Sequence, residues 1–223
     1  MPEAAAADGW RERRRESARA AIVAVAWTAV REEGLAGLSM RDLARRAGIT
    51  TPTLYTYFGS KNDIYDAMFG QAAEEFAACT AAPYGTGDPR EILVAGLHRF
   101  ARFCVGDVVR YQLLFQRTIP GFEPSAESYA PAVRALEGSR QRLALNGVTD
   151  SRHLDMWTAL TTGLVSQQIS NDPGGDRWTR LVEEFVDMFL AHCRDNRPAG
   201  ASPGAAALMK GPPHDHKGRR DRP

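Results

Sequence analysis

Prolines and glycines divide this 223-residue chain into separate stretches, and this division limits its possible folds more than any other feature. They cluster at residues 83–89, 120–124 and 172–175, and again after Asn196. The stretches between these clusters rarely alternate apolar and polar residues with the two-residue period of a β-strand. Several of them instead repeat apolar residues with the period of an α-helix. The sequence therefore predicts an all-α fold.

The first helix is expected at residues 10–33, because apolar residues recur there every three or four positions and Gly34 can end it. Two short helices, at residues 39–46 and 50–58, are expected on either side of Gly48. Their candidate N-caps, and that of the next helix, are Ser39, Thr50 or Thr51, and Ser60. The later helices are expected at residues 60–81, 88–116 with a break near Gly106, 126–146, 151–170 and 176–194.

The two short helices joined through Gly48 form a candidate helix-turn-helix, a motif whose second helix enters the major groove of DNA. Leu54 and Phe58 are four residues apart, so both face the core of such a unit. This leaves Thr51, Thr53, Tyr55, Thr56 and Tyr57 for the outer face. Their hydroxyls suit phosphates and base edges, and threonine methyl groups suit thymine methyl groups. The alternative is a small three-helix bundle of another function, with Tyr55 packed inside it.

At these residues the sequence resembles the tetracycline-repressor (TetR) family of regulators. The resemblance covers roughly residues 14–68 and is strongest over residues 37–61. The matching motifs are Gly48-Ile49-Thr50 at the turn, Thr53-Leu54-Tyr55-x-x-Phe58 in the second short helix, and Ser60-Lys61 just after it. One departure is Gly59, where many members carry proline. The resemblance implies an N-terminal three-helix DNA-binding domain, followed by a helical domain for ligand binding and dimerisation.

The resemblance also implies contacts with DNA for individual residues. Arg41, on the first short helix, matches a position that often reaches a base edge. Thr56 matches a variable position that contacts bases or backbone, and Tyr57 and Lys61 match phosphate contacts. The base-facing turn of the second helix is matched by Thr51, Pro52, Thr53 and Tyr55. That helix contains no Arg or Lys, so we expect weak guanine recognition from it.

The chain is expected to consist of four parts: a flexible N-terminal arm (1–12), the DNA-binding domain (13–66), the ligand-binding and dimerisation domain (67–195) and a disordered tail (196–223). The tail has almost no large apolar residue, so it cannot bury enough surface to offset its chain entropy. Near the start, Arg11, Arg13, Arg14, Arg15 and Arg19 allow two interpretations. They either contact the minor groove of DNA or form a solvated charged run.

The two helices expected at residues 151–170 and 176–194 carry apolar residues that must be buried against other helices. The stretch at 181–192 is apolar on two sides, so its own domain can cover one side and a second subunit the other. The expected dimerisation residues are Leu160, Leu164, Leu181, Phe185, Met188 and Phe189. The alternative is a central helix in a monomeric bundle.

A ligand cavity is expected among the large apolar side chains of the second domain. The candidates are Phe100, Phe103, Tyr111, Leu114, Phe115, Phe122 and Trp157. A cavity among them would favour an apolar or aromatic ligand. The alternative is that each of them belongs to the ordinary core.

The sequence predicts no catalytic residue, metal site or cofactor. Metal enzymes built on helical bundles need inward carboxylates with Glu-x-x-His pairs, and the chain has none. Asp150 and His153 have a similar spacing, but Asp150 stands at a helix start, where it serves as a cap. Phosphate-binding loops and nucleophile motifs are also missing from the sequence. The three cysteines, Cys79, Cys104 and Cys193, are too scattered for a disulfide framework or a zinc site.

Charge and hydropathy complete the prediction. The apolar runs are shorter than a membrane span and no secretory signal is visible, so we expect a cytoplasmic protein with no membrane contact. The net charge of +1 combines positive ends with an acidic middle, which argues against a non-specific architectural DNA-binding protein. We therefore expect a homodimeric repressor that binds a palindromic operator in double-stranded DNA and is released by a small-molecule effector. Activation is the alternative mode of regulation.

Overall fold

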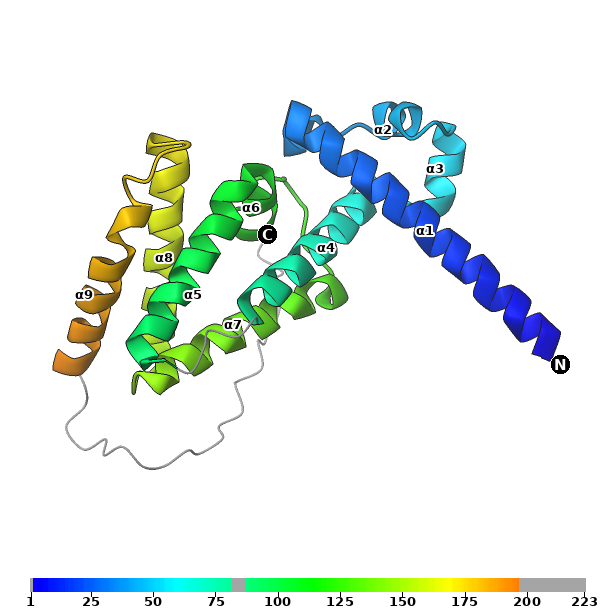
Figure 1. Cartoon of the computed structure of the whole chain (residues 1–223). Helices are drawn as coiled ribbons and strands as arrows, with labels where there is room; N and C mark the ends of the chain where they lie inside the picture. Colours follow the sequence, from blue (N-terminus) through cyan, green and yellow to red (C-terminus); the bar gives the residue numbers. More distant parts are fainter. Residues whose placement is uncertain (1, 82–86, 197–223) are drawn as a thin grey trace, which may run out of the picture.

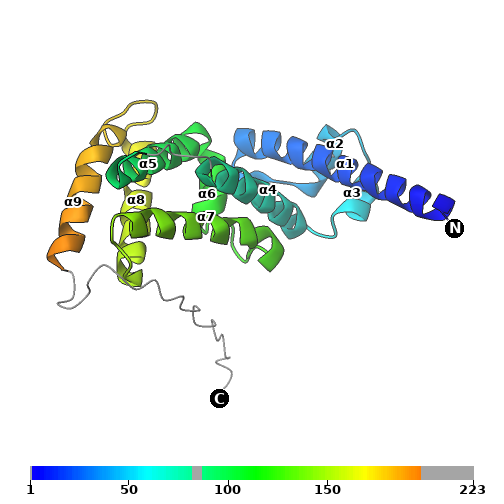
Figure 2. The same cartoon turned by 60° about the horizontal axis from the view of Figure 1, so that its bottom comes forward.

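The computed structural model describes residues 2–81 and 87–196, and within these residues it contains helices and no strand, as the sequence predicted. The head (residues 2–60) lies at one end, the body (residues 87–196) at the other, and α4 runs between them (Figures 1 and 2). The helices are α1 (Pro2–Glu33), α2 (Met40–Arg46), α3 (Thr51–Tyr57), α4 (Lys61–Ala81), α5 (Pro89–Gly106), α6 (Val108–Phe115), α7 (Ala126–Leu145), α8 (Ser151–Asn171) and α9 (Val182–Asp195). The expected tail lies, apart from Asn196, outside the described residues.

The head is held together by one apolar core, because each of its helices turns one face inward. Val30 of α1, Leu43 of α2 and Leu54 of α3 are all completely buried there. A short 3-10 turn, Leu35–Gly37, joins α1 to α2. The backbone φ of Gly34 is +77°, a left-handed conformation that glycine adopts without strain, so α1 ends where the sequence predicted.

The first helix is longer than expected. It begins at Pro2 rather than near Trp10, so residues 2–12, which we expected to form a separate arm, continue the helix. The first part of α1 extends past α3 and away from the rest of the molecule (Figure 1). The arginines near its start are therefore carried on a helix.

α4 begins at the predicted cap. The Ser60 hydroxyl accepts the backbone N–H of Asp63 at 3.2 Å and donates to the Asp63 carboxylate at 2.8 Å. The first turns of α4 belong to the core of the head, which runs on to Ala73 and includes Leu113 of α6. The domain boundary expected at residue 66 therefore falls inside a continuous core.

α7 packs along α4, and a carboxylate joins the two helices near the start of α7. Asp66 of α4 accepts the backbone N–H of Ser125 at 2.7 Å and the hydroxyls of Ser125 and Ser128, both at 2.9 Å. One turn further along α4, a Cβ atom on Gly70 would lie only 3.0 Å from the Ser128 hydroxyl. The missing side chain at Gly70 thus lets α4 and α7 approach closely.

A second connection joins the head to the body at the break between α5 and α6. Arg31, in the last turn of α1, forms an ion pair with Asp107, with 2.7 Å between Nη2 and Oδ2. Asp107 also caps α6, because its carboxylate accepts the backbone N–H of Arg110 at 3.0 Å. Arg110 in turn pairs with Glu75 of α4 at 2.9 Å. The predicted break near Gly106 is confirmed, and Asp107 at this break contacts α1.

The body has a second apolar core, to which all five of its helices contribute. Its most buried members include Leu93, Tyr111, Leu143, Val165 and Val186. α5 and α8 begin at the aspartate caps Asp88 and Asp150, whose carboxylates accept backbone N–H groups of the first turn. None of the helices within the described ranges is both long enough and apolar enough to cross a membrane.

α9 begins later than expected, because a side chain of α8 organises the loop before it. The sequence suggested a helix from residue 176, but α9 begins at Val182 after a 3-10 turn at Thr179–Leu181. The fully buried side chain of Gln168 accepts the backbone N–H of Trp178 at 2.9 Å and donates to the Gly175 carbonyl at 3.0 Å. These bonds pair backbone groups of the loop with the Gln168 side chain, so the loop does not need helical hydrogen bonds there.

Candidate nucleic-acid interface and cavity

The turn between α2 and α3 has the predicted form. Gly48 has a φ of +68°, and the next N–H, that of Ile49, closes the end of α2. Thr50, rather than Thr51, is the N-cap of α3, and its hydroxyl accepts the backbone N–H of Thr53 at 3.2 Å. Pro52 stands in the first turn, where a missing N–H costs little.

α3 turns one face to the core and the other to solvent. Leu54 and Phe58 are 0% and 1% exposed, whereas Tyr55 between them is 49% exposed. The alternative in which Tyr55 packs inside a three-helix bundle is therefore wrong. Pro52, Thr53 and Thr56 are exposed with Tyr55, and Thr51 is half-buried. α3 thus presents hydroxyl groups to solvent and has no charged side chain of its own.

Of the three arginines on α2, Arg41 differs from the other two. Arg45 and Arg46 both pair with Asp42, and Arg46 also pairs with Glu32 and Glu33 of α1. Hydrogen bonds from the two guanidinium groups hold the pKa of Asp42 below its usual value. Arg41 is exposed and takes part in no ion pair among the described residues. It is the cation of α2 that remains available to an outside partner.

Tyr57 and Lys61 are less open than the exposed residues of α3. Tyr57 is half-buried and packs against the core of the head. The Lys61 ammonium group donates to the carbonyl of Ala36 at 3.3 Å, which fixes the start of α4 to the turn after α1. A phosphate contact from Lys61 would have to share this ammonium group with the Ala36 carbonyl.

α1 runs beside the end of α3, an arrangement that the sequence analysis did not predict. The guanidinium group of Arg19 donates to the carbonyl of Tyr57 and lies 4.1 Å from the centre of the Phe58 ring. One turn earlier, Arg15 donates to the carbonyl of Thr56 at 3.5 Å. Both arginines satisfy the C-terminal end of α3, where cations are favourable. Their spacing of four residues, which places them on one helix face, was the available signal.

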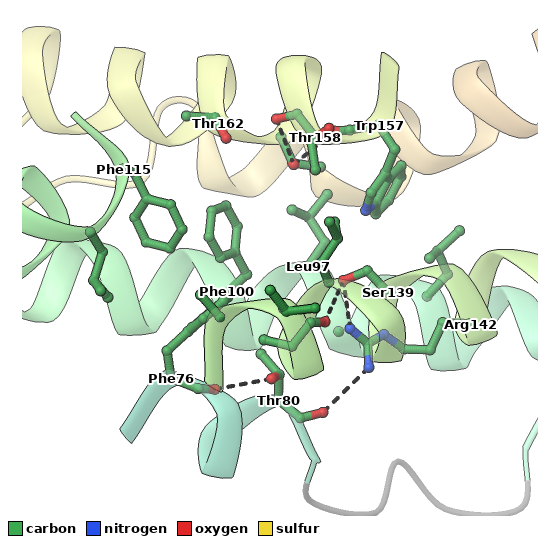
Figure 3. Close-up of a pocket in the computed structure, with 18 of the residues that line it drawn as sticks. Phe76, Thr80, Leu97, Phe100, Phe115, Ser139, Arg142, Trp157, Thr158 and Thr162 are labelled. Carbon is green, nitrogen blue, oxygen red and sulfur yellow. Dashed lines mark hydrogen bonds between the residues drawn. The ribbon is translucent and has the colours of Figure 1, made fainter. Parts of the chain in front are cut away.

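The body contains a cavity of about 300 Å³ among α4, α5, α6, α7 and α8. Figure 3 shows Phe100 and Phe115 toward one end of it, and Trp157, Ser139 and Arg142 toward the other. Four of the seven predicted residues line this cavity, namely Phe100, Leu114, Phe115 and Trp157.

Three predicted residues do not line this cavity, because they belong to the surrounding core. Phe103 and Tyr111 are buried in the core of the body, where Phe103 lies under the guanidinium group of Arg110. Phe122 packs against the core of the head, with its ring centre 5.7 Å from that of Tyr65. For these three residues the alternative interpretation, that they belong to the ordinary core, is correct.

The sequence analysis missed several lining residues on α4 and α7. They include Phe76 and Thr80 of α4, and Leu136, Ser139 and Arg142 of α7. Ser139 and Arg142 are three residues apart and share a helix face with Ala135. A polar pair on an otherwise apolar face is the signal that could have identified this wall.

The expected dimerisation residues divide into two groups. Leu160 and Met188 are 37% and 58% exposed, and Leu181 and Phe185 are half-buried. Leu164 and Phe189 are 8% and 2% exposed, because they fill the core of their own protomer. These two therefore offer little surface to a second subunit. α8 and α9 lie at the end of the molecule farthest from α3 (Figures 1 and 2).

The chain resembles known regulators in the sequence of its head. Residues 22–68 match the family model described as "Bacterial regulatory proteins, tetR family". Among curated proteins, the HTH-type transcriptional activator FasR of Mycolicibacterium smegmatis is 28% identical over 103 residues, which are 46% of this chain and 47% of that protein. The match thus spans about half the length of that relative. In the described part of the chain, no group of three or more His, Cys, Asp or Glu residues could hold a metal ion.

Solved structures resemble both head and body. A TetR-family transcriptional regulator from Streptomyces coelicolor has a TM-score of 0.64 at 20% identity, over 81% of this chain and 83% of that one. FadR from Bacillus subtilis, in complex with stearoyl-CoA, has a TM-score of 0.56 at 18% identity, over 77% and 97% of the two chains. RolR in complex with resorcinol has a TM-score of 0.53 at 22% identity, over 84% and 97%. These likenesses show the fold, and the family match shows that residues 22–68 of the head are similar to the tetR family of bacterial regulatory proteins.

Proposed function

We propose that this chain is a homodimeric transcriptional repressor, bound to a palindromic operator and released from it by a small apolar or aromatic ligand. The observation that carries this proposal is the exposed face of α3, which presents Thr53, Tyr55 and Thr56 to solvent while Leu54 anchors it to the core. A helix held in this way can enter a major groove without losing its packing.

The chemistry of this face favours contact with DNA. Its hydroxyl groups can reach phosphates and base edges, and its threonine methyl groups can meet thymine methyl groups. Arg41 adds an exposed guanidinium group on the preceding helix, and this group can bond guanine with two N–H donors. In this proposal Tyr57 and Lys61 contact phosphates.

Dimerisation is supported by the outer face of α8 and α9. Leu160 and Met188 are large apolar residues exposed on neighbouring helices, and Leu181 and Phe185, which precede Met188 in the sequence, are half-buried. Apolar residues on an outer helix face favour burial against a second copy. A two-fold symmetric dimer carries two identical α3 helices and so requires a DNA site with two-fold symmetry.

The cavity of the body supports a ligand-responsive function. Most of its wall is apolar, and its volume of about 300 Å³ is at the lower end for ligand sites. FadR and RolR, which share the fold, were solved with stearoyl-CoA and resorcinol respectively. Because the cavity is separate from α3, a ligand would act by favouring one placement of the two heads over another.

Selection of bound DNA from random sequence tests the first part of the proposal. We expect one site with two similar half-sites, protected in footprinting, and a Thr53→Val variant that binds it more weakly. Thr28→Val, at an exposed threonine on α1 outside the proposed face, is the matched control and should bind normally. A single half-site bound by a monomer, or broad protection without preference, would contradict the proposal.

A reporter gene placed behind the selected site tests the direction of regulation. Repression predicts higher expression when the chain is deleted and when a releasing compound is added. The relative FasR is named an activator, and lower expression on deletion would assign this chain the same mode. Ligand and operator should also weaken each other's binding by the same factor, as linkage requires.

A further inference from the structure

The start of α1 and the end of α3 form a shallow groove on the head. Its lining includes Trp10, Arg14 and Arg15 of α1, and Thr56 and Tyr57 of α3. Thr56 also belongs to the exposed face of α3 that is proposed to contact DNA. The first part of α1 runs on past α3 and away from the rest of the molecule (Figure 1). The groove therefore continues the exposed face of α3 outward along α1.

The charged residues in this part of α1 are divided between two faces. Successive residues of a helix are 100° apart, which places Arg14 and Arg15 on the side of the groove. Glu12 and Glu16 are four residues apart on the other side of the helix. Among the described residues that line the groove there is no Asp or Glu. The side of α1 next to α3 is thus positively charged.

Arg14 and Arg15 are both exposed, and neutral groups hold them at the groove. The guanidinium group of Arg14 lies 4.6 Å from the centre of the Trp10 ring, which is itself 54% exposed. Arg15 donates to the carbonyl of Thr56 at 3.5 Å. Within residues 2–81 and 87–196, neither arginine takes part in an ion pair. These contacts orient two positive charges without cancelling them.

The helical form of α1 decides which part of DNA these charges can meet. A helix is about 10–12 Å wide with its side chains, and the minor groove of DNA is only about 6 Å wide. Arginines carried on a helix therefore approach the phosphates at the edge of the duplex and not the floor of the minor groove. Arginine binds phosphate oxygens with two parallel N–H donors.

We propose that Arg14 and Arg15 bind a phosphate of the DNA backbone in this groove, outside the half-site that α3 contacts. Trp10 acts as a positioning residue, because its ring supports the guanidinium group of Arg14. This inference rests on the DNA-binding function proposed above, and it adds a contact in the flank of each half-site. A phosphate contact carries no sequence information, so the flank can have any sequence.

Single substitutions test this contact, with Arg13 as the matched control. Arg13 and Arg14 are adjacent, exposed and equally charged, but Arg13 does not line the groove. On the selected site within a longer duplex, Arg14→Gln should raise the dissociation constant about threefold to tenfold. It should also lower the slope of log K against log salt by about 1. Arg13→Gln should change both values less, and Arg14→Lys, which keeps the charge, should retain most of the affinity.

Equal effects of Arg13→Gln and Arg14→Gln would show only an influence of net charge and would overturn the proposal. Both substitutions place a good helix former at an exposed position, so neither should change the melting temperature. A lower melting temperature for Arg14→Gln alone would make Arg14 a structural residue, and this result would also contradict the proposal.

Phosphate ethylation interference locates the contact on DNA. Ethylation removes the charge of a single phosphate, so it weakens binding wherever the protein contacts that phosphate. With the unsubstituted chain, one sensitive phosphate is expected in each flank, beyond the bases that selection fixes. This phosphate should become insensitive in Arg14→Gln and stay sensitive in Arg13→Gln. A flank without any sensitive phosphate would contradict the proposal.

The results separate this inference from the proposed function. If a palindromic site is selected and Arg14→Gln behaves like Arg13→Gln, the contact through α1 is contradicted and the proposed function stands. If no site is selected, the same salt titration is made on a random-sequence duplex. A loss confined to Arg14→Gln would then contradict the proposed function alone, and no such loss would contradict both.

Discussion

Leu54 and Tyr55 are adjacent in the sequence, yet one is completely buried and the other is half exposed. This difference follows from the 100° turn between neighbouring residues of a helix, which places Leu54 against the core and Tyr55 outside. The two cations expected from the sequence to contact DNA also differ in their surroundings. Arg41 is exposed with a charged group available, whereas Lys61 already bonds a carbonyl.

Arg41 and Lys61 should affect DNA binding in different ways. Arg41→Ala should lower affinity for the selected site by about 1–3 kcal/mol and relax base preference at one position, because a guanidinium group reads a base edge. Lys61→Ala and Tyr57→Phe should weaken binding similarly on all sequences, and Lys61→Ala should lower the slope of log K against log salt by about 1. Competition assays over several salt concentrations measure both effects. A changed base preference in Lys61→Ala would contradict its assignment to phosphate.

Tyr65 gives a test of stability that is independent of DNA. Its buried hydroxyl donates to the carbonyl of Leu35, so Tyr65→Phe leaves that carbonyl without this bond and should cost about 1–3 kcal/mol in urea unfolding. Burial also raises the pKa of Tyr65 from 10.0 to about 12. Because the folded state holds this proton more tightly, its contribution to stability is complete below pH 10 and is lost as the pH rises toward 12.

Comparison with Tyr55 isolates this effect of pH. Tyr65→Phe should reduce the pH dependence of unfolding above pH 10. Tyr55→Phe, which removes the hydroxyl of a half-exposed side chain, is the matched control. Identical pH profiles for the two variants would show that the buried hydroxyl of Tyr65 is not the titrating group.

Between elements, the contact of α4 with α7 connects the head to the wall of the cavity. α4 begins in the core of the head and ends at Phe76 and Thr80 of the cavity, and α7 supplies Ser139 and Arg142. The carboxylate of Asp66 fixes the start of α7 to α4. A displacement of α7 by the proposed ligand would therefore act on the same helix that carries the head.

Asp66→Ala should weaken this joint. It removes a charged acceptor from one backbone N–H and two hydroxyls, so the free energy of unfolding should fall by about 2–3 kcal/mol. Glu74→Ala is the matched control, because Glu74 joins the same two helices through an exposed ion pair with Arg134, and its loss should cost less than about 1 kcal/mol. Urea titrations measure both values. Equal costs would show that Asp66 is no more important than a surface charge.

The helices of this fold were largely predictable, because apolar spacing and caps are local signals. The break near Gly106, the turn at Gly48 and the cap at Ser60 were all found in the sequence. Ser39 occupies the N-cap position of α2 as predicted, but its side chain makes no capping hydrogen bond. The sequence thus predicted the position of this cap and not its hydrogen bond. The late start of α9 was missed, because the fully buried side chain of Gln168 on α8 bonds the backbone of the loop at Trp178. This contact joins residues that are not neighbours in the sequence, so no local pattern indicates it.

The sites were less predictable than the helices, because they depend on which helix faces meet. The exposed face of α3 could be read from the four-residue spacing of Leu54 and Phe58 alone. The cavity could not, since its wall combines α4, α5, α6, α7 and α8, and the sequence gives no crossing angles. Aromatic residues therefore identified part of the wall, and Phe122 belonged to the core of the head instead.

At the scale of the whole molecule, the proposed dimer can be tested at the exposed apolar residues of α9. Met188→Glu should prevent dimerisation, because it places a charge on the exposed apolar part of α9. Leu145→Glu is the matched control, since Leu145 is exposed to the same extent on α7, away from the proposed interface. Light scattering after size-exclusion chromatography should give monomer mass for the first variant and dimer mass for the second. A dimeric Met188→Glu protein would exclude α9 as the interface.

The ion pair between Arg31 and Asp107 restricts how the head can move. The head is attached to the body through the continuous helix α4, through this ion pair at the end of α1, and through Leu113 of α6, which belongs to the core of the head. A rotation of the head that leaves α6 in place must therefore break the ion pair and repack Leu113. A rotation that keeps both contacts must carry α6 along, and α6 supplies Leu114 and Phe115 to the wall of the cavity.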